Sequence, residues 1–215
     1  MSVRRVKFCV FAACLVPLGL LAWRAVAGDL TANPIEYITH RTGDWTLRFL
    51  LLTLAVTPLR KLMGWAQLAS FRRMLGLFAF FYATLHFSTY LVLDFFFDFE
   101  LILDDVIERR YVTAGFFGFV SLVPLAVTST KAMTRRLGGE RWRRLHRLAY
   151  VAAVAGVVHY FWLVKIDVLP PLAYAVILAA LLGSRVWFRY TNHHVRRASA
   201  TGRDRGVPAD ADLVG

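Results

Sequence analysis

The sequence predicts an all-α membrane protein whose six transmembrane helices form one bundle. The 215-residue chain is 58% hydrophobic, which exceeds the roughly one half that is typical of soluble domains. Its apolar residues fall into blocks of about twenty, the length that an α-helix needs to cross about 30 Å of hydrocarbon. Short polar loops separate the blocks and leave no room for a separate soluble domain.

Proline and glycine limit several of the blocks. Pro58 closes the second block, Gly138-Gly139 interrupts the loop before the fifth, and Pro170-Pro171 forms the turn into the sixth. The expected spans are 8–26, 45–63, 75–94, 113–130, 147–164 and 172–189. They form one transmembrane domain, residues 1–195. The tail at 196–215 is polar and has no apolar periodicity, so we expect it to be disordered.

The first block also has features of a secretory signal peptide. Basic residues precede its apolar run, and Ala25-Val26-Ala27 fits a signal-peptidase site. The run from Phe8 to Trp23 is slightly long for a signal core, and Arg24 stands just before the site. We therefore interpret this block as a retained transmembrane helix.

The charge of the loops predicts how the bundle is oriented. Basic residues gather at the N-terminus, between the second and third blocks, between the fourth and fifth, and in the tail, whereas the loop between the third and fourth blocks is acidic. That acidic loop holds Asp94, Asp98, Glu100, Asp104, Asp105 and Glu108. Because basic loops stay in the cytoplasm, we expect both termini to be cytoplasmic, in agreement with an even number of spans.

Two function classes are excluded by these patterns. The net charge of +12 could indicate nucleic acid, but the basic residues flank apolar spans instead of covering one folded surface, so membrane lipid is the expected partner. No glycine-rich phosphate loop follows a strand, so a nucleotide-binding domain is not expected.

Two histidines stand out because ionisable groups inside a bilayer are functional candidates. His86 lies in the third span and His159 in the fifth, and both spans rise from the cytoplasm. At 1.5 Å per residue, His86 and His159 lie about 16 Å and about 18 Å above the cytoplasmic starts of their spans. Two imidazoles at nearly one depth on separate helices could bind one iron from both sides.

Small residues adjoin both histidines on their helices. Ala79 and Ala83 precede the first, and Ala152, Ala155 and Gly156 precede the second. A flat macrocycle needs such residues to lie close to a helix, although small residues also serve tight helix packing. Together with the equal depth of the histidines, they favour b-type heme with iron bound by this pair.

His146 marks the cytoplasmic start of the fifth span. It precedes His159 by 13 residues, which corresponds to about 20 Å of rise and about 220° of rotation in a regular helix. The two would not share a face unless the helix start is irregular. His146 could ligate a second heme together with another ligand type, a shared histidine or an open position, or it could contact a quinone, a flavin or a propionate. The number of hemes is therefore one or two.

Two further polar residues lie near the periplasmic end of the second span. Arg48 stands about one turn inside the span, where it could bind a heme propionate through its guanidinium fork or reach to the headgroups. His40 is expected in the first periplasmic loop, either as a loop residue or over a cofactor edge.

An ordered set of short motifs runs through nearly the whole chain except the tail. The third span holds Arg72-Arg73-Met74-Leu75-Gly76-Leu77 and Ala83-Thr84-Leu85-His86. The others are Thr42-Gly43 after His40, Thr57-Pro58-Leu59, Thr128-Ser129-Thr130, Leu137-Gly138, Trp142 with Leu145-His146 and Tyr150, and His159-Tyr160 with Trp162, Val164 and Lys165. This set resembles the MsrQ family, formerly called YedZ, and is far more specific than any single motif.

The resemblance implies a function that composition alone does not. The MsrQ family is similar in architecture to the membrane domains of ferric reductases and NADPH oxidases, binds heme b and is associated with FMN. It passes electrons from the quinone pool or a cytosolic flavin reductase to MsrP, a periplasmic molybdenum-cofactor enzyme that reduces methionine sulfoxide in proteins. The resemblance therefore implies a multi-pass protein of the bacterial inner membrane that serves as an electron-transfer subunit and is not itself the enzyme.

The family's heme-linked histidines fall on His86, His146 and His159. The third span has no second histidine, unlike the oxidase relatives, and Thr128 to Thr130 with the adjacent basic loop is the candidate FMN region.

Three other functions stay open. One is a ferric reductase-like cytochrome with another acceptor, one a non-heme proton-coupled transporter with a histidine relay, and one an assembly factor whose histidines join helices by hydrogen bonds.

Overall fold

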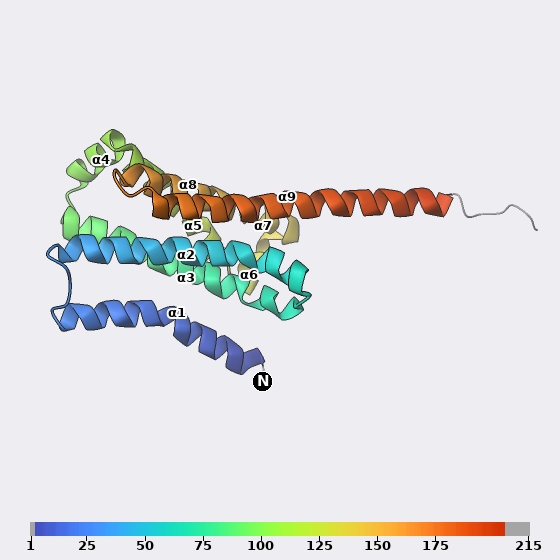
Figure 1. The fold of residues 1–215 in the computed structure, drawn as a ribbon, viewed down its shortest axis with the longest axis horizontal. Coiled ribbons are helices and arrows are strands. Elements are labelled where there is room, and N and C mark those ends of the chain that lie inside the picture. Colours follow the sequence, from blue (N-terminus) through green and yellow to red (C-terminus); the bar gives the residue numbers. More distant parts are fainter. Residues whose placement is uncertain (1–2, 205–215) are drawn as a thin grey trace, which may run out of the picture.

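All regular structure among residues 3–204 is helical in the computed structural model, which describes these residues except for the side chains of residues 189 and 192–204. Figure 1 shows the long helices side by side along one common axis. They are α1 (Val3–Val26), α2 (Pro34–Met63), α3 (Arg72–Thr89), α5 (Arg110–Val127), α8 (Leu148–Leu163) and α9 (Leu169–Asp204). Shorter helical segments are η1 (Ala66–Ser70), η2 (Tyr90–Asp94), α4 (Phe99–Glu108), α6 (Lys131–Leu137) and α7 (Gly139–Leu145). The all-α prediction is thus confirmed.

Within residues 3–204, four segments are long and apolar enough to cross a membrane, namely Val3–Val26, Ala66–Asp94, Arg110–Val127 and Leu169–Phe188. The other two predicted spans coincide with α2 and α8. Asp44 and Arg48 lie within the body of α2, and α8 has 16 residues. A transmembrane protein is therefore supported, and six spans stay a prediction.

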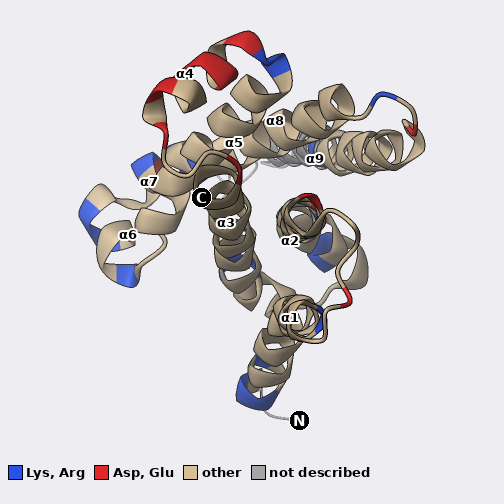
Figure 2. Cartoon of the chain, turned by 90° about the vertical axis from the view of Figure 1, so that its left-hand side faces the viewer, with Lys and Arg blue, Asp and Glu red and all other residues tan. Residues whose placement is uncertain are grey.

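The charged residues separate toward the two ends of the bundle. Figure 2 shows Asp and Glu gathered on α4, and Lys and Arg on α6, α7 and the start of α1. In Figure 1, α4 lies at one end of the long helices, whereas α6, α7 and the N-terminus lie toward the other. This separation is the one that the loop sequences predict. The C-terminal end of α9 extends beyond the basic end and enters the predicted polar tail, whose residues 205–215 lie outside the described part.

Two segments that the sequence pattern predicts to be loops are helical in the structure. The helix α2 begins at Pro34, where the side chain of Asn33 accepts a hydrogen bond from the Glu36 N–H, so the prediction that His40 lies in a loop is wrong. The acidic loop contains α4, which Asp98 caps by accepting from the Leu101 N–H. Both starts carry the side-chain cap that satisfies free amide groups at a helix N-terminus. The apolar blocks do not predict them because α4 has only 10 residues and the start of α2 carries charged residues among its apolar ones.

The bundle core forms where helices pack in pairs. The helix α2 packs mainly against α3, and α5 packs mainly against α8. Leu54, Ala79, Tyr82 and Ala153 are almost completely buried in this core. The small residues allow close approach of the helices, and the two pairs face each other across the space that holds the functional residues.

The hydroxyl of Tyr82 on α3 forms hydrogen bonds with two backbone groups of α1. The Tyr82 hydroxyl donates to the Cys14 carbonyl at 2.9 Å and accepts from the Leu18 N–H at 3.1 Å. These are the two groups that an uninterrupted helix would pair with each other. Pro17 lies between them, and Figure 1 shows α1 bent near its middle. An inserted side chain beside a proline is a physical cause of such a bend.

We expect Tyr82→Phe to destabilise the protein by about 1–3 kcal/mol, because it leaves two buried backbone groups without their partner. The substitution keeps the ring and removes only the hydroxyl. Thermal unfolding of the purified protein in detergent measures the effect. An unchanged midpoint would show that the hydroxyl does not support the bend.

Candidate functional site

A cavity of about 1220 Å³ lies between the α2–α3 pair and the α5–α8 pair. Leu47, Leu50, Ala83, Leu122 and Gly156 contribute to its apolar wall. Its volume exceeds the range of about 300–1,000 Å³ that is typical of small-ligand pockets. The interior can therefore hold a large, flat and mainly apolar molecule.

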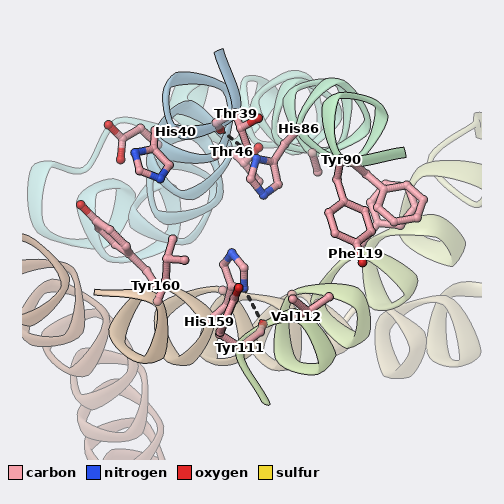
Figure 3. A pocket seen from close by; sticks show the side chains of 18 of the residues that line it. Thr39, His40, Thr46, His86, Tyr90, Tyr111, Val112, Phe119, His159 and Tyr160 are labelled. Carbon is pink, nitrogen blue, oxygen red and sulfur yellow. Dashed lines mark hydrogen bonds between the residues drawn. The ribbon is translucent and has the colours of Figure 1, made fainter. Parts of the chain in front are cut away.

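The structure brings two of the predicted histidines together in this cavity. The ring centroids of His86 and His159 are 6.0 Å apart, and the ring planes meet at 77°. Figure 3 shows the rings projecting from opposite walls, each with its outer nitrogen directed into the space between them. The equal depth inferred from the helix rise thus corresponds to a real juxtaposition.

A backbone carbonyl fixes the orientation of each imidazole ring. His86 Nδ1 lies 2.9 Å from the Thr39 carbonyl oxygen, and His159 Nδ1 lies 2.6 Å from the Tyr111 carbonyl oxygen. A carbonyl oxygen only accepts, so each Nδ1 must carry the hydrogen. In the neutral ring Nε2 then has a free lone pair, which is the form of histidine that binds metals.

The spacing of the rings fits two axial ligands of one metal ion. A metal–imidazole bond of about 2 Å plus about 1.2 Å from nitrogen to ring centre, counted once for each ring, puts the two ring centres about 6.4 Å apart. The observed 6.0 Å is close to this value. Among the described residues, no group of three or more His, Cys, Asp or Glu side chains could hold a metal ion. Two facing imidazoles inside a cavity of this volume suit a metal whose other ligands come from a macrocycle.

Two glycines let the rings lie directly against neighbouring helices. A Cβ atom at Gly43 of α2 would stand 3.1 Å from the His86 ring. At Gly115 of α5 it would stand 2.7 Å from His159 Nδ1, closer than real Cβ contacts allow. Gly43 belongs to one of the sequence motifs. Gly115 is a site residue that sequence reasoning missed, because its role comes from a contact between helices.

His146 lies apart from the pair, in the turn between α7 and α8. Its ring stacks on Trp142 with centroids 3.8 Å apart, and its Nε2 is 3.1 Å from Thr128 Oγ1. The Thr128 hydroxyl donates its hydrogen to the Pro124 carbonyl at 2.6 Å, so Nε2–H of His146 is the donor to Thr128. Burial of the ring and, to a smaller extent, the positive charge of Arg72 lower the pKa of His146. The lowered pKa favours the neutral ring.

Arg48 does not belong to the described cavity lining. Its Nε donates to the Tyr174 hydroxyl at 3.0 Å, and its guanidinium lies 3.8 Å from the Asp44 carboxylate and over the Trp45 ring. This arrangement joins α2 to α9. Arg41 and Arg109 are the arginines that line the rim of the cavity.

These features define a helical membrane protein with a paired-imidazole site inside its bundle, and comparisons with known proteins agree. Residues 42–157 match the family described as ferric reductase like transmembrane component. Over 201 residues the chain is 50% identical to a protein of Herminiimonas arsenicoxydans, with 93% of this chain and 92% of that protein covered. A relative from Rhodospirillum rubrum is 53% identical over 180 residues, which cover 84% and 86% of the two chains.

Both relatives are named protein-methionine-sulfoxide reductase heme-binding subunit MsrQ. The chain therefore belongs to the ferric reductase-like transmembrane family and, within it, to the MsrQ family. The resemblance seen in the sequence motifs is confirmed.

We expect Gly115→Ala to destabilise the protein by about 1–3 kcal/mol, because overpacking forces a buried ring to shift. Gly118→Ala on the same helix is the matched control, since a Cβ there would meet its nearest neighbour at an ordinary 3.4 Å. Thermal unfolding of both variants measures the difference. Equal midpoints would contradict the close contact between Gly115 and His159.

Proposed function

We propose that the chain is a membrane cytochrome that carries electrons across the bilayer on b-type heme bound by His86 and His159. The observation that carries this proposal is the juxtaposition of the two imidazoles inside a large apolar cavity. The names of the relatives, which describe heme-binding subunits, support the choice of ligand.

Heme supplies reversible one-electron chemistry at its iron, which amino-acid side chains do not provide. The residues of the chain hold and tune it. The carbonyls of Thr39 and Tyr111 keep both Nε2 lone pairs directed at the iron position and make the imidazoles stronger donors. Leu47, Leu50 and Leu122 exclude water, so the local dielectric around the iron is low.

Propionate groups require cationic or hydrogen-bonding partners at the polar rim. Arg41 lines the rim of the cavity, and its guanidinium matches a carboxylate geometrically. Arg48 would first have to leave Tyr174 and Asp44. We therefore propose Arg41 as a propionate partner ahead of Arg48.

The basic end of the bundle is the proposed entry point for electrons. His146 and Thr128 lie together there, beside a loop rich in arginine. A second heme, an FMN or a quinone headgroup at this place would extend the electron path to the cytoplasmic side. Since Nε2 of His146 already donates to Thr128, Nδ1 is its available lone pair. The proposed donors are the quinone pool and a cytosolic flavin reductase.

The proposed acceptor is a periplasmic enzyme, the molybdenum-dependent MsrP, which would reduce methionine sulfoxide in proteins. The name of the relatives, which are subunits of a protein-methionine-sulfoxide reductase, supports this partner. The chain would act in the bacterial inner membrane with six spans and both termini in the cytoplasm. The acidic end with α4 would then face the periplasm, as loop charge predicts.

The match to the ferric reductase-like family favours one second candidate, a cytochrome of the same build with another acceptor. Membrane vesicles that hold the reduced protein separate the two functions. Re-oxidation by the periplasmic reductase together with methionine sulfoxide favours the first, and re-oxidation by ferric chelates alone favours the second.

We expect the purified protein to be red, with a Soret band that shifts on dithionite reduction. His86→Ala and His159→Ala should each lose most of the heme, because one of the two histidines that would hold it and one side of the binding site disappear. Heme per protein, measured as pyridine hemochrome, checks this result. Added imidazole should restore a six-coordinate spectrum in either variant by entering the vacated space.

His40→Ala is the matched control, since His40 lines the same cavity but lies outside the ring pair. It should retain heme and the wild-type reduced spectrum. If the two ligand variants keep full heme and an unchanged reduced spectrum, the ligand assignment is wrong. A colourless folded protein from heme-replete cells would refute the cytochrome itself.

The span number and orientation are tested with reporter fusions. With six spans, alkaline phosphatase should be active after residue 30 and after residue 98, and inactive after residues 65 and 138, because basic loops remain in the cytoplasm. Fluorescent-protein fusions should give the inverse pattern. Equal activity after residues 30 and 65 would show that α2 does not cross the membrane.

A further inference from the structure

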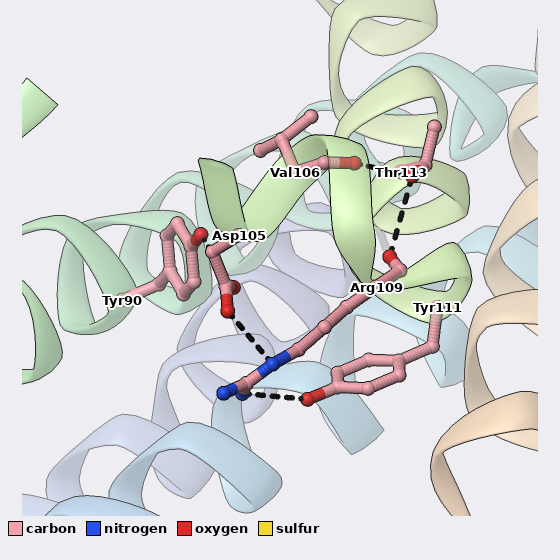
Figure 4. A network of polar contacts seen from close by, with 6 residues as sticks. All are labelled: Tyr90, Asp105, Val106, Arg109, Tyr111 and Thr113. Atoms are coloured by element: carbon pink, nitrogen blue, oxygen red, sulfur yellow. Dashed lines mark hydrogen bonds and ion pairs between the residues drawn. The ribbon is translucent and has the colours of Figure 1, made fainter. Parts of the chain in front are cut away.

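A polar network at the rim of the cavity joins the end of α3, which carries His86, to the start of α5, where the Tyr111 carbonyl contacts His159. The Tyr90 hydroxyl donates to Asp105 Oδ2 at 2.9 Å, and Arg109 Nε is 2.8 Å from Asp105 Oδ1. Arg109 Nη1 then donates to the Tyr111 hydroxyl at 3.1 Å. Figure 4 shows the Asp105 carboxylate between Tyr90 and Arg109, with the Arg109 side chain extended to Tyr111.

Each end of this network lies next to one of the paired imidazoles. Tyr111 is the residue whose carbonyl binds His159 Nδ1 at 2.6 Å. Tyr90 follows His86 by one helical turn, and its N–H donates to the His86 carbonyl. Tyr90 also begins η2, a π-helical turn, and such turns are frequent at functional sites.

Asp105 is buried in an unusual way for a residue of a short surface helix. Its side chain is 7% exposed, whereas Leu103 and Ile107 on the same helix are more than half exposed. Burial of a carboxylate is unfavourable unless it is paired and hydrogen-bonded, and here both oxygens have partners. The helix α4 thus turns an acidic side chain inward, against its own hydrophobic pattern.

A second contact fixes α4 to the start of α5. The Thr113 hydroxyl donates to the Val106 carbonyl at 2.5 Å. The position of Asp105 relative to the Tyr111 backbone is therefore set by two connections, one between side chains and one from the Thr113 hydroxyl to a backbone carbonyl. These two connections limit how far Asp105 and Tyr111 can move relative to each other while α4 stays folded.

We propose that Asp105 and Arg109 are positioning residues that hold Tyr111, and through its carbonyl the His159 imidazole, in the orientation for binding iron. This inference rests on the proposed function, because it gives α4 a role in setting the properties of the heme. Without the network, Tyr111 can move, the His159 Nδ1–H bond weakens, and the ring gains rotational freedom. A weaker Nδ1–H bond makes the imidazole a poorer donor to ferric iron.

Asp105→Asn tests the network, and Asp104→Asn is its matched control. Both substitutions remove one carboxylate from α4, but Asp104 is exposed. Tyr111→Phe is the second test variant. It removes the hydroxyl that Arg109 binds, keeps the carbonyl that His159 needs and changes no charge, so an electrostatic effect on the iron is excluded.

We expect Asp105→Asn and Tyr111→Phe to release heme to apomyoglobin about tenfold faster than the wild type, within the range seen when outer-shell partners of metal ligands are removed. Their reduction potentials should rise, and the low-spin ferric EPR signal should broaden or change in anisotropy. Asp104→Asn should match the wild type in all three measurements. Because the substitutions act on one network, the double variant should show less than the sum of the two single effects.

The proposal is overturned if Tyr111→Phe and Asp105→Asn retain the wild-type EPR signal and potential, even where thermal stability falls. Should Asp105→Asn fail to fold, Tyr111→Phe decides alone. A wild-type protein without a low-spin heme signal would instead refute the proposed function, so the two failures are distinguishable.

Discussion

Hydrogen bonds from two imidazoles to backbone carbonyls are the interaction on which the site depends. Each ring could rotate about its side-chain bonds, but the carbonyls of Thr39 and Tyr111 fix both the orientation and the tautomer. Because the carbonyls belong to α2 and α5, each histidine is held by a helix other than its own. The packing of the helix pairs therefore determines the directions of the two Nε2 lone pairs, which both face the cavity.

The rest of the fold serves this geometry. Gly43 and Gly115 let the rings touch the helices that hold them, and small core residues bring those helices close together. The short helix α4 braces the rim through Asp105 and Arg109. At the opposite end His146 is packed separately against Trp142, at the place where we propose a distinct step in the electron path.

The close approach of His86 and His159 could be predicted from sequence because helix rise is a local and regular quantity. The same arithmetic placed His146 away from the pair, and an irregular helix start is indeed present there. The start of α2, the helix α4 and the role of Gly115 were not predictable in this way. They depend on end caps, on a helix of only 10 residues and on contacts between helices, which the search for long apolar blocks does not detect. Arg48 illustrates the same limit, since its partner Tyr174 lies far along the chain.

A cryo-EM map of the protein purified from heme-replete membranes tests the central claim most directly. The account predicts one heme iron bound by Nε2 of both His86 and His159, with each Nδ1 still within hydrogen-bonding distance of its backbone carbonyl. A heme located elsewhere in the bundle, or an iron ligated by only one of these two rings, would contradict it.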